Sequence, residues 1–317
     1  MADNKKIAII ATHSFGYIDF LVNKLNSYEN VDLVYINIDA IPFKYKNKLS
    51  RFKNSVLKLF SFCGLKEKNR TDFIKKALLS DQKFDQILVI RPDKLQKEAL
   101  IFLRENTVNL ISFFFDGIEN FTDKKKTLSF FDTIYSYDKK DVEDYNFTFL
   151  TNYIYDDKIE KKEIKNLAFN IMSFDQRFSF LEKIASYLTQ KKISFLFIVK
   201  KDKPFKHDTI QISKCYLPIN EVKDLIASSL VLLDLQQKNQ NGLSFRIFEA
   251  LGYSKKLITN NQDVVNYDFY NPNNIFVVTE NDVNIPIDFF ETEYMQVNSE
   301  TIKKYTLERW IFTVFGV

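Results

Sequence analysis

Short apolar runs alternate with helix-like stretches along the whole chain, and this alternation restricts the fold more than any other feature. The first run, residues 7–12 (IAIIAT), is followed by a turn at Gly16 and by apolar residues at helical spacing from Phe20 to Tyr28. Residues 31–38 then have the composition of a second buried strand. Apolar strands that alternate with helices are typical of parallel sheets covered on both faces. The sequence therefore predicts an α/β fold.

The alternation occurs in two series, which predicts two domains. At 317 residues the chain is too long for one small core and suits two domains of roughly 150 residues each. A charge-rich stretch, 152–165, separates the series. We expect strands at 7–12, 31–38, 86–90, 110–115 and 133–137, and then at 167–172, 193–199, 209–212, 231–235 and 256–259. Helices are expected near 52–62, 73–79, 95–104, 178–188, 221–228, 245–253 and 301–315.

The expected architecture is two Rossmann-like domains, 1–155 and 156–300, that face a central cleft. Open parallel sheets place ligands beyond the carboxyl ends of their strands. We therefore look for functional residues in the loops that follow strands.

The charge balance argues against nucleic acid as a partner. The chain has 45 Lys plus Arg and 41 Asp plus Glu, a net charge of +4, and the basic residues are dispersed among acidic ones. Residues 44–76 are more basic and include several phenylalanines and leucines. An ordinary amphipathic helix with a solvated lysine face is the simpler interpretation, and peripheral association with an anionic membrane surface is the alternative.

The two cysteines and the start of the chain predict a cytoplasmic protein. Cys63 and Cys215 are too far apart in sequence for a disulfide framework or a zinc-ligand pair. The apolar run after the first residues is too short for a secretory signal, and no run of about 18 apolar residues follows. We expect the protein in the cytoplasm. If it associates with a membrane, we expect this at the inner face of the cytoplasmic membrane.

The loop before residues 245–253 has the composition of an anion site. Gly242 and Ser244 precede this predicted helix, and Arg246 and Glu249 lie within it. A helix start offers free N–H groups and a partial positive charge, and a nearby arginine adds charge-assisted hydrogen bonds. Together they suit a diphosphate. The alternative is that the serine is only a helix cap and the glycine only a turn.

The same segment also resembles a known family. Residues 240–261, QNGLSFRIFEALGYSKKLITNN, resemble the donor-sugar site of GT-B glycosyltransferases of the group 1 type, as found in bacterial capsule and lipopolysaccharide biosynthesis. Residues 109–120, 131–141 and 171–185 are similar to other strands and helices of that family, and 305–316 to the helix that crosses back toward the first domain. The terminal helix, 301–317, is therefore expected to pack toward the first domain.

The resemblance implies metal-independent transfer of a hexosyl-type sugar from a nucleotide-sugar donor to a glycan or lipid-linked acceptor, with no cofactor. It implies that Glu249 contacts the ribose hydroxyls. The diphosphate would be held by Arg177 and Arg246 and by the main-chain N–H groups of Gly242, Leu243 and Ser244. Fixed positive groups of this kind stabilise the charge that grows on a nucleoside-diphosphate leaving group.

One residue departs from the family pattern. Many retaining members have two glutamates in an E-x(7)-E pattern, and here Asn241 takes the first position while Glu249 takes the second. Asn241 can hydrogen-bond a sugar hydroxyl but cannot supply the charge of a carboxylate. Whether transfer retains or inverts the anomeric configuration therefore stays open.

The candidates for a catalytic base lie in the first domain. Asp116 ends an apolar strand and precedes Gly117, which should direct its carboxylate into the cleft, although an Asp here can also cap a turn. His13, after the first strand, is the second candidate, and a structural role is its alternative. Asp138, Asp141 and Asp144 are expected to form a solvated helix start.

The sequence lacks the motifs of several other enzyme classes. The chain has neither a G-x-G-x-x-G fingerprint nor a P-loop, and its two histidines do not support a Ser/His/Asp arrangement. Two further functions stay open beside glycosyl transfer. One is a nucleotide-sugar epimerase of the same architecture, and the other is a catalytically silent subunit that binds a nucleotide or a glycan.

Overall fold

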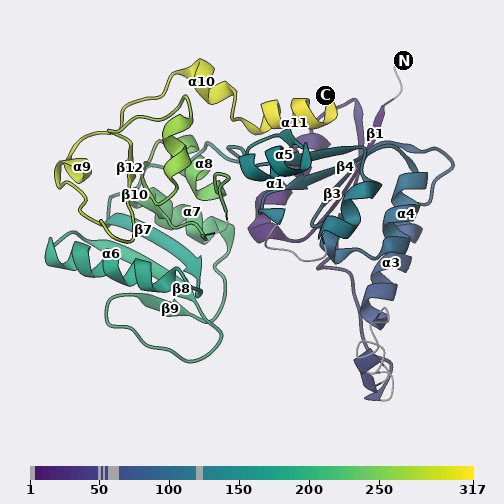
Figure 1. Cartoon of the computed structure of the whole chain (residues 1–317), viewed down its shortest axis with the longest axis horizontal. Coiled ribbons are helices and arrows are strands. Elements are labelled where there is room, and N and C mark those ends of the chain that lie inside the picture. The colour runs from purple at the N-terminus through teal and green to yellow at the C-terminus, as the bar shows by residue number, and fades with distance from the viewer. Residues whose placement is uncertain (1–3, 49–50, 53, 56–63, 119–123, 239) are drawn as a thin grey trace. The chain divides into compact units, whose positions relative to one another are not determined.

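The computed structural model describes residues 4–48, 51–52, 54–55, 64–118, 124–238 and 240–317 (Figure 1). The chain divides into two compact units. Unit 1 comprises Met1–Leu150 with Ile311–Val317, and unit 2 comprises Thr151–Trp310. Most of the predicted helix at 52–62, and Cys63, lie outside the described residues.

Unit 1 is built on a six-stranded sheet whose strands are all parallel, in the order β2-β1-β3-β4-β5-β6. The strands are β1 (Lys5–Ala11), β2 (Val31–Asn37), β3 (Phe84–Ile90), β4 (Thr107–Phe114), β5 (Thr133–Ser136) and β6 (Thr148–Phe149). The α-helices described here are α1 (Tyr17–Asn26), α3 (Leu65–Leu78), α4 (Lys97–Glu105) and α5 (Lys139–Tyr145). The predicted apolar runs at 7–12 and 86–90 are the central strands β1 and β3, which explains why they contain almost no polar residue.

Unit 2 repeats this plan with a second parallel six-stranded sheet, in the order β12-β11-β10-β7-β8-β9. The strands are β7 (Asn166–Ser173), β8 (Phe195–Lys200), β9 (Gln211–Ser213), β10 (Ser229–Asp234), β11 (Lys256–Thr259) and β12 (Ile275–Val277). The helices are α6 (Phe178–Gln190), α7 (Ile219–Ala227), α8 (Phe245–Gly252), α9 (Asp288–Glu291) and α10 (Ser299–Lys303). The predicted α/β class with two parallel sheets is confirmed.

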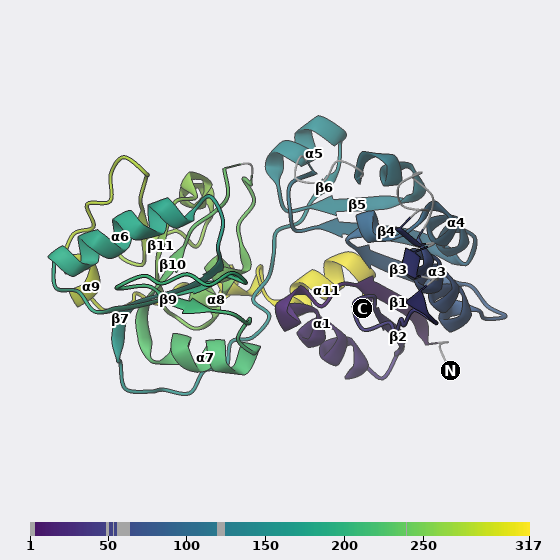
Figure 2. The same cartoon turned by 90° about the horizontal axis from the view of Figure 1, so that it is seen from below.

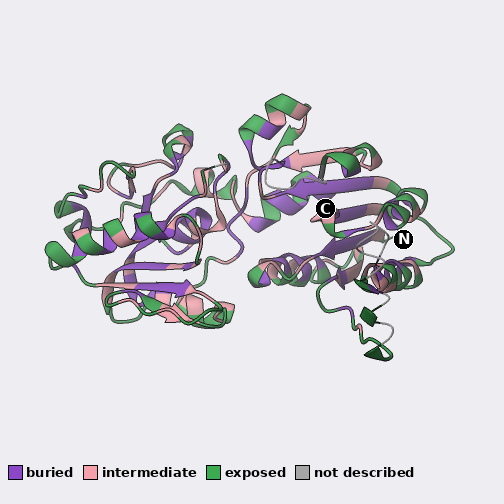
Figure 3. Ribbon diagram, turned by 60° about the horizontal axis from the view of Figure 1, so that its bottom comes forward, coloured by how far each residue is buried: buried purple, intermediate pink, exposed green. Residues whose placement is uncertain are grey.

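The central strand of unit 2 is buried on both faces. Along β10, Val231 and Leu233 belong to the apolar cluster that includes the residues of α6, whereas Leu232 belongs to the cluster that includes those of α8. The two helices that cover the sheet are labelled in Figure 2, and Figure 3 shows many buried residues along the strands. Since side chains alternate along a strand, a strand covered on both faces must be apolar throughout.

The predicted terminal helix is interrupted. The structure has α10 and then α11 (Leu307–Phe315) in place of one helix over 301–315. The break comes where the carbonyl oxygen of Tyr305 accepts the N–H of Ile154 at 2.8 Å and Thr306 forms a parallel bridge with the same residue. A strand-like backbone bond at this point is incompatible with a continuing helix. From Ile311 onward α11 belongs to unit 1, where the side chain of Gln86 donates to the carbonyl oxygen of Val314 at 3.0 Å.

Candidate functional site

The predicted anion site lies at the carboxyl end of the central strand of unit 2. The β10–α8 loop, defined here as residues 240–244, leads from β10 into α8. β10 pairs with β7 on one side and β11 on the other. The loop therefore occupies the middle of the sheet edge at which open α/β sheets bind ligands.

Three side-chain amides hold three successive carbonyl groups of this loop. Asn261 donates to the oxygen of Asn241 at 3.3 Å, and Gln236 donates to the oxygen of Gly242. Asn152 donates to the oxygen of Leu243 at 2.8 Å. Each of these carbonyls therefore has a fixed direction.

The fixed carbonyls also orient the N–H groups that follow them. In a trans peptide the carbonyl and the N–H point in opposite directions. The N–H groups of Gly242, Leu243 and Ser244 therefore point away from the three amides, and they donate no hydrogen bond to a described residue. These are the three main-chain groups that the sequence resemblance assigned to the phosphates.

Ser244 stands at the N-cap of α8 but does not cap it. Its hydroxyl donates to Asp234 at 2.7 Å, and the hydroxyl of Thr259 donates to the other oxygen of the same carboxylate at 3.0 Å. Burial raises the pKa of Asp234, although both hydrogen bonds and the charges of Arg246 and Arg177 act in the opposite direction. The first turn of α8 therefore keeps its N–H groups without a side-chain cap from Ser244.

Arg177 is held beside the end of β10. Its guanidinium contacts both oxygens of Asp175, with Nε 2.9 Å from Oδ1 and Nη2 2.6 Å from Oδ2, and Nη1 donates to the carbonyl of Leu235 at 2.6 Å. Burial raises the pKa of Asp175, but the hydrogen bonds and charge of Arg177 outweigh it, and the pKa lies below its usual value. The side chain of Arg177 is about one-fifth exposed, so it is fixed and still accessible to an anion.

Arg246 and Glu249 form a buried pair on α8. The carboxylate of Glu249 accepts a hydrogen bond from Arg246 at one oxygen and from the hydroxyl of Tyr155 at the other. Its side chain is only 1% exposed. Both oxygens of Glu249 therefore have protein partners. The contact with ribose stays a prediction, and it requires that ribose replace at least one of these two partners.

The candidate residues of unit 1 gather at the carboxyl edge of its sheet. The N–H of His13, after β1, donates to the carboxylate of Asp39, after β2, at 3.1 Å. Arg91, after β3, is paired with Asp93 at 2.8 Å. Burial lowers the pKa of Arg91, but its bond to Asp93 outweighs this, and the charges of Asp116 and Asp39 raise the pKa further. Asp116 is half-buried and His13 is exposed.

The turn after His13 has an unusual backbone. Ser14, Phe15 and Gly16 have φ values of 45°, 57° and 91°. Left-handed conformations at two successive non-glycine residues are costly and are concentrated at functional sites. This turn, which the sequence did not single out beyond Gly16, supports a functional role for the same sheet edge.

The expectation of a solvated aspartate cluster at 138–144 is wrong for two of its members. Asp138 does start α5, by accepting the N–H of Lys140 at 2.9 Å, but it is buried. Asp141 is also buried and accepts the N–H of Ile118 at 2.9 Å. Asp141 therefore ties α5 to the loop after β4, a long-range contact that charge spacing cannot reveal.

The basic stretch at 44–76 is partly described. α3 buries Thr71, Ile74 and Leu78, and its lysines Lys66 and Lys76 are exposed. This is the ordinary amphipathic helix of the simpler interpretation, and membrane association stays a prediction. In the part of the chain that the structure describes, no helix is both long enough and apolar enough to cross a membrane. Within the same residues, no group of three or more His, Cys, Asp or Glu could hold a metal ion.

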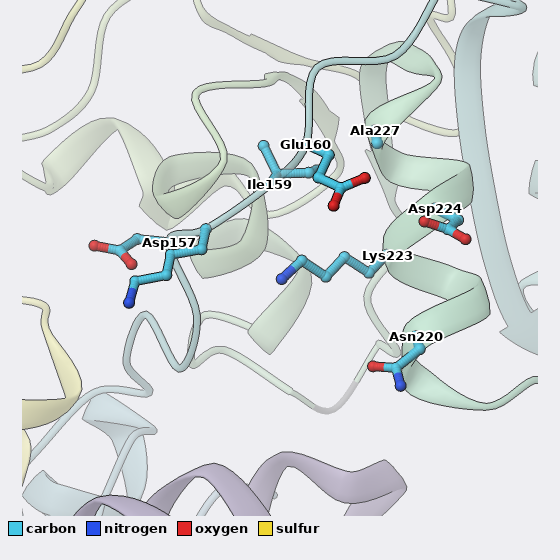
Figure 4. A pocket seen from close by; sticks show the side chains of 8 residues that line it. Asp157, Ile159, Glu160, Asn220, Lys223, Asp224 and Ala227 are labelled. Carbon is cyan, nitrogen blue, oxygen red and sulfur yellow. The ribbon is translucent and has the colours of Figure 1, made fainter.

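A separate pocket of about 640 Å³ lies between α7 and the chain segment that precedes β7 (Figure 4). It is lined by Asp157, Lys158, Ile159, Glu160, Asn220, Lys223, Asp224 and Ala227. Lys223 reaches from α7 toward the segment and pairs with Asp156. None of the predicted site residues lines this pocket, and its mixed charges favour no ligand class.

Comparison with known proteins identifies the fold and leaves the family open. No protein-family model matches the sequence, and no curated protein matches it significantly. The structure is similar to a solved structure titled "Crystal structure of UDP-N-acetylglucosamine 2-epimerase", with a TM-score of 0.56 and 10% sequence identity over 99% of this chain and 96% of that one. The chain has a GT-B-like fold. At this identity the likeness concerns the fold alone.

Several residues that shape this edge of the unit 2 sheet were not predicted from the sequence. Asp234 stands at the carboxyl end of an apolar strand, and the rule that selected Asp116 at such a place could also have selected Asp234. Asn152 and Tyr155 lie in the stretch interpreted as a charged boundary. Their role depends on contacts with residues more than 90 positions away, which no local pattern shows.

Proposed function

We propose that this chain is an enzyme that acts on a nucleotide sugar, whose diphosphate is bound by the β10–α8 loop of unit 2. The observation that carries the proposal is the set of three oriented N–H groups at Gly242, Leu243 and Ser244, directly before the start of α8. Oriented N–H groups at a helix start bind phosphate well. Arg177 supports this by supplying a fixed positive charge at the same sheet edge.

Two reactions fit this site, and each has its own support. The structurally similar protein is by its title an epimerase of a nucleotide sugar, which favours epimerisation. The resemblance of residues 240–261 favours transfer of a sugar to a glycan or lipid-linked acceptor in surface-polysaccharide assembly. In either reaction Asn241, which is exposed, would bind a sugar hydroxyl, and no metal ion or cofactor would be required.

Asp116 and His13 are the proposed candidates for the acid–base group. Asp116 lies close enough to Arg91 for the two charges to interact, so a positive group stands near this candidate. If transfer to a lipid-linked acceptor is the reaction, peripheral binding to the inner face of the membrane through the basic stretch at 44–76 is part of the proposal.

A ligand screen followed by product analysis tests the proposal. Thermal stability is first measured with UDP, GDP, ADP, CMP and dTDP and with their common sugar conjugates, because a ligand of the native state raises apparent stability. The conjugates that stabilise the protein are then incubated with it, with and without a glycolipid extract. Epimerisation yields a new sugar nucleotide, whereas transfer or slow hydrolysis releases the free nucleotide. Binding without either product supports the silent subunit, and no stabilisation by any of these ligands contradicts the proposal.

A further inference from the structure

The segment 151–156, which follows unit 1 in the chain and belongs to unit 2, lies along one face of α8. Three positions of this helix face it: Phe245, Glu249 and Gly252. Their spacing of four and then three residues places them on one side of a helix. The opposite side of α8, which includes Ile247 and Leu251, is buried in the core. The segment is therefore the outer partner of the helix that starts at the proposed phosphate site.

The contacts are specific at each of these positions. The ring of Tyr153 meets that of Phe245 edge-on with centroids 5.3 Å apart. The hydroxyl of Tyr155 donates to the buried carboxylate of Glu249. These contacts lie successively along the helix, and both tyrosines are buried.

Gly252 allows the closest approach. A Cβ atom at this position would lie 2.5 Å from Cγ2 of Ile154 and 2.9 Å from the backbone oxygen of Asp156. Both distances are too short for a real Cβ contact, and a backbone oxygen cannot rotate away. Any side chain at position 252 must therefore displace the segment from the helix.

Asn152 extends the same contact to the β10–α8 loop. Its Nδ2 donates to the carbonyl of Leu243, and its Oδ1 is buried with no hydrogen-bond partner among the described residues. A buried amide with only one of its two polar ends satisfied is costly. The donated bond fixes the peptide plane whose other end is the N–H of Ser244.

We propose that Asn152 and Tyr155 are positioning residues for the diphosphate, an inference that rests on the proposed function. Asn152 directs the N–H of Ser244 through the carbonyl of Leu243. Tyr155 holds α8 through Glu249, and so fixes where the helix start lies. Neither residue touches the diphosphate. Residues 151–156, called the brace below, thus orient the phosphate-binding N–H groups without contacting the ligand.

The test compares ligand affinity among folded variants that disturb the brace in different ways. Asn152→Ala removes the bond to the loop, Tyr155→Phe removes the bond to Glu249, and Gly252→Ala displaces the segment without changing a polar group. Tyr187→Phe is the control, because it removes a tyrosine hydroxyl elsewhere in unit 2, which donates to the carbonyl of Ile285 at 2.7 Å. Affinity for the nucleoside diphosphate that stabilises the wild type is measured by calorimetry well below the unfolding temperature of every variant.

We expect a loss of affinity on the order of tenfold in Asn152→Ala and in Gly252→Ala, a smaller loss in Tyr155→Phe, and none in Tyr187→Phe. A purely structural role would lower the unfolding temperature and leave the affinity of the folded protein unchanged, and that result overturns the inference. If Asn152→Ala does not fold, Gly252→Ala carries the same test, and helix propensity alone predicts no harm from that change. A wild type that binds no nucleoside diphosphate contradicts the proposed function itself, whereas equal binding by wild type and variants contradicts only the brace.

Discussion

The hydroxyl of Ser244 donates to the buried carboxylate of Asp234 at 2.7 Å, although Ser244 stands where a serine ordinarily caps a helix. The last residue of β10 and the N-cap residue of α8 are thereby joined directly. This bond closes the ten-residue span between them, and the hydroxyl of Ser244 therefore does not cap the N–H groups of the helix start.

Ser244→Ala should destabilise unit 2. The buried carboxylate of Asp234 keeps only the hydrogen bond from Thr259, and a lost bond to a buried charged group costs about 1–3 kcal/mol. The single tryptophan, Trp310, lies in unit 2, so its fluorescence during urea unfolding follows that unit. Ser213→Ala, which removes a hydroxyl of unit 2 that donates to the carbonyl of Cys215, is the control. Equal stability of the two variants would show that the bond to Asp234 contributes little.

Arg177→Ala should weaken binding of a nucleoside diphosphate by roughly ten- to a hundredfold, because a charge-assisted hydrogen bond contributes about 1.5–3 kcal/mol. Calorimetric titration measures the change. Arg104→Ala in unit 1 is the matched control, since that arginine is about half exposed and pairs with Asp132. Unchanged affinity in Arg177→Ala removes this residue from the site.

Asp175→Asn should reduce stability at neutral pH and leave it unchanged in acid. The pKa of Asp175 lies below its ordinary value of 3.8, because the bonds from Arg177 outweigh the effect of burial. A lowered carboxyl pKa contributes stability that is present above the ordinary pKa and is lost as the pH falls through the folded-state pKa. Thermal unfolding is measured from pH 7 to pH 3. The difference in unfolding temperature between wild type and variant should be constant near neutral pH and should shrink below about pH 4. A difference that persists undiminished at pH 3 contradicts the assigned ion pair.

Asp116→Asn should keep nucleotide affinity and lose turnover, because general acid–base groups contribute about 10²- to 10⁴-fold to a rate. Product formation from the active nucleotide sugar is measured beside calorimetric affinity. Asp85→Asn is the control: Asp85 lies at the amino end of β3, where it accepts the N–H of Lys6. Full turnover in Asp116→Asn would leave His13 as the candidate, to be tested by His13→Gln.

The strands of the fold were predictable where burial dictates composition. The strand predicted at 256–259 is β11 (Lys256–Thr259), and the helix predicted at 245–253 is α8 (Phe245–Gly252) to within one residue. The short edge strands β6 and β12 were missed, because two or three residues carry no periodicity. The break before α11 was missed because it depends on the backbone of Ile154, far away in the sequence.

The site was predictable only in part, for a similar reason. Gly242 and Ser244 stand out locally, as a glycine and a serine directly before a helix. The amides that hold the loop come from Asn152, Gln236 and Asn261, and ordinary polar residues of this kind are identified only by what they contact. Sequence therefore singles out the loop of the proposed anion site but not the groups that orient it.

Unit 1 is assembled from two distant stretches of the chain, and this has a consequence for biosynthesis. The backbone after Ile311 bonds to β1 and β3 through Lys5 and Gln86. While the ribosome is still translating unit 2, the nascent first unit lacks these contacts and leaves the surface they cover exposed to chaperones. Unit 1 can therefore be completed only after the whole of unit 2 has been made.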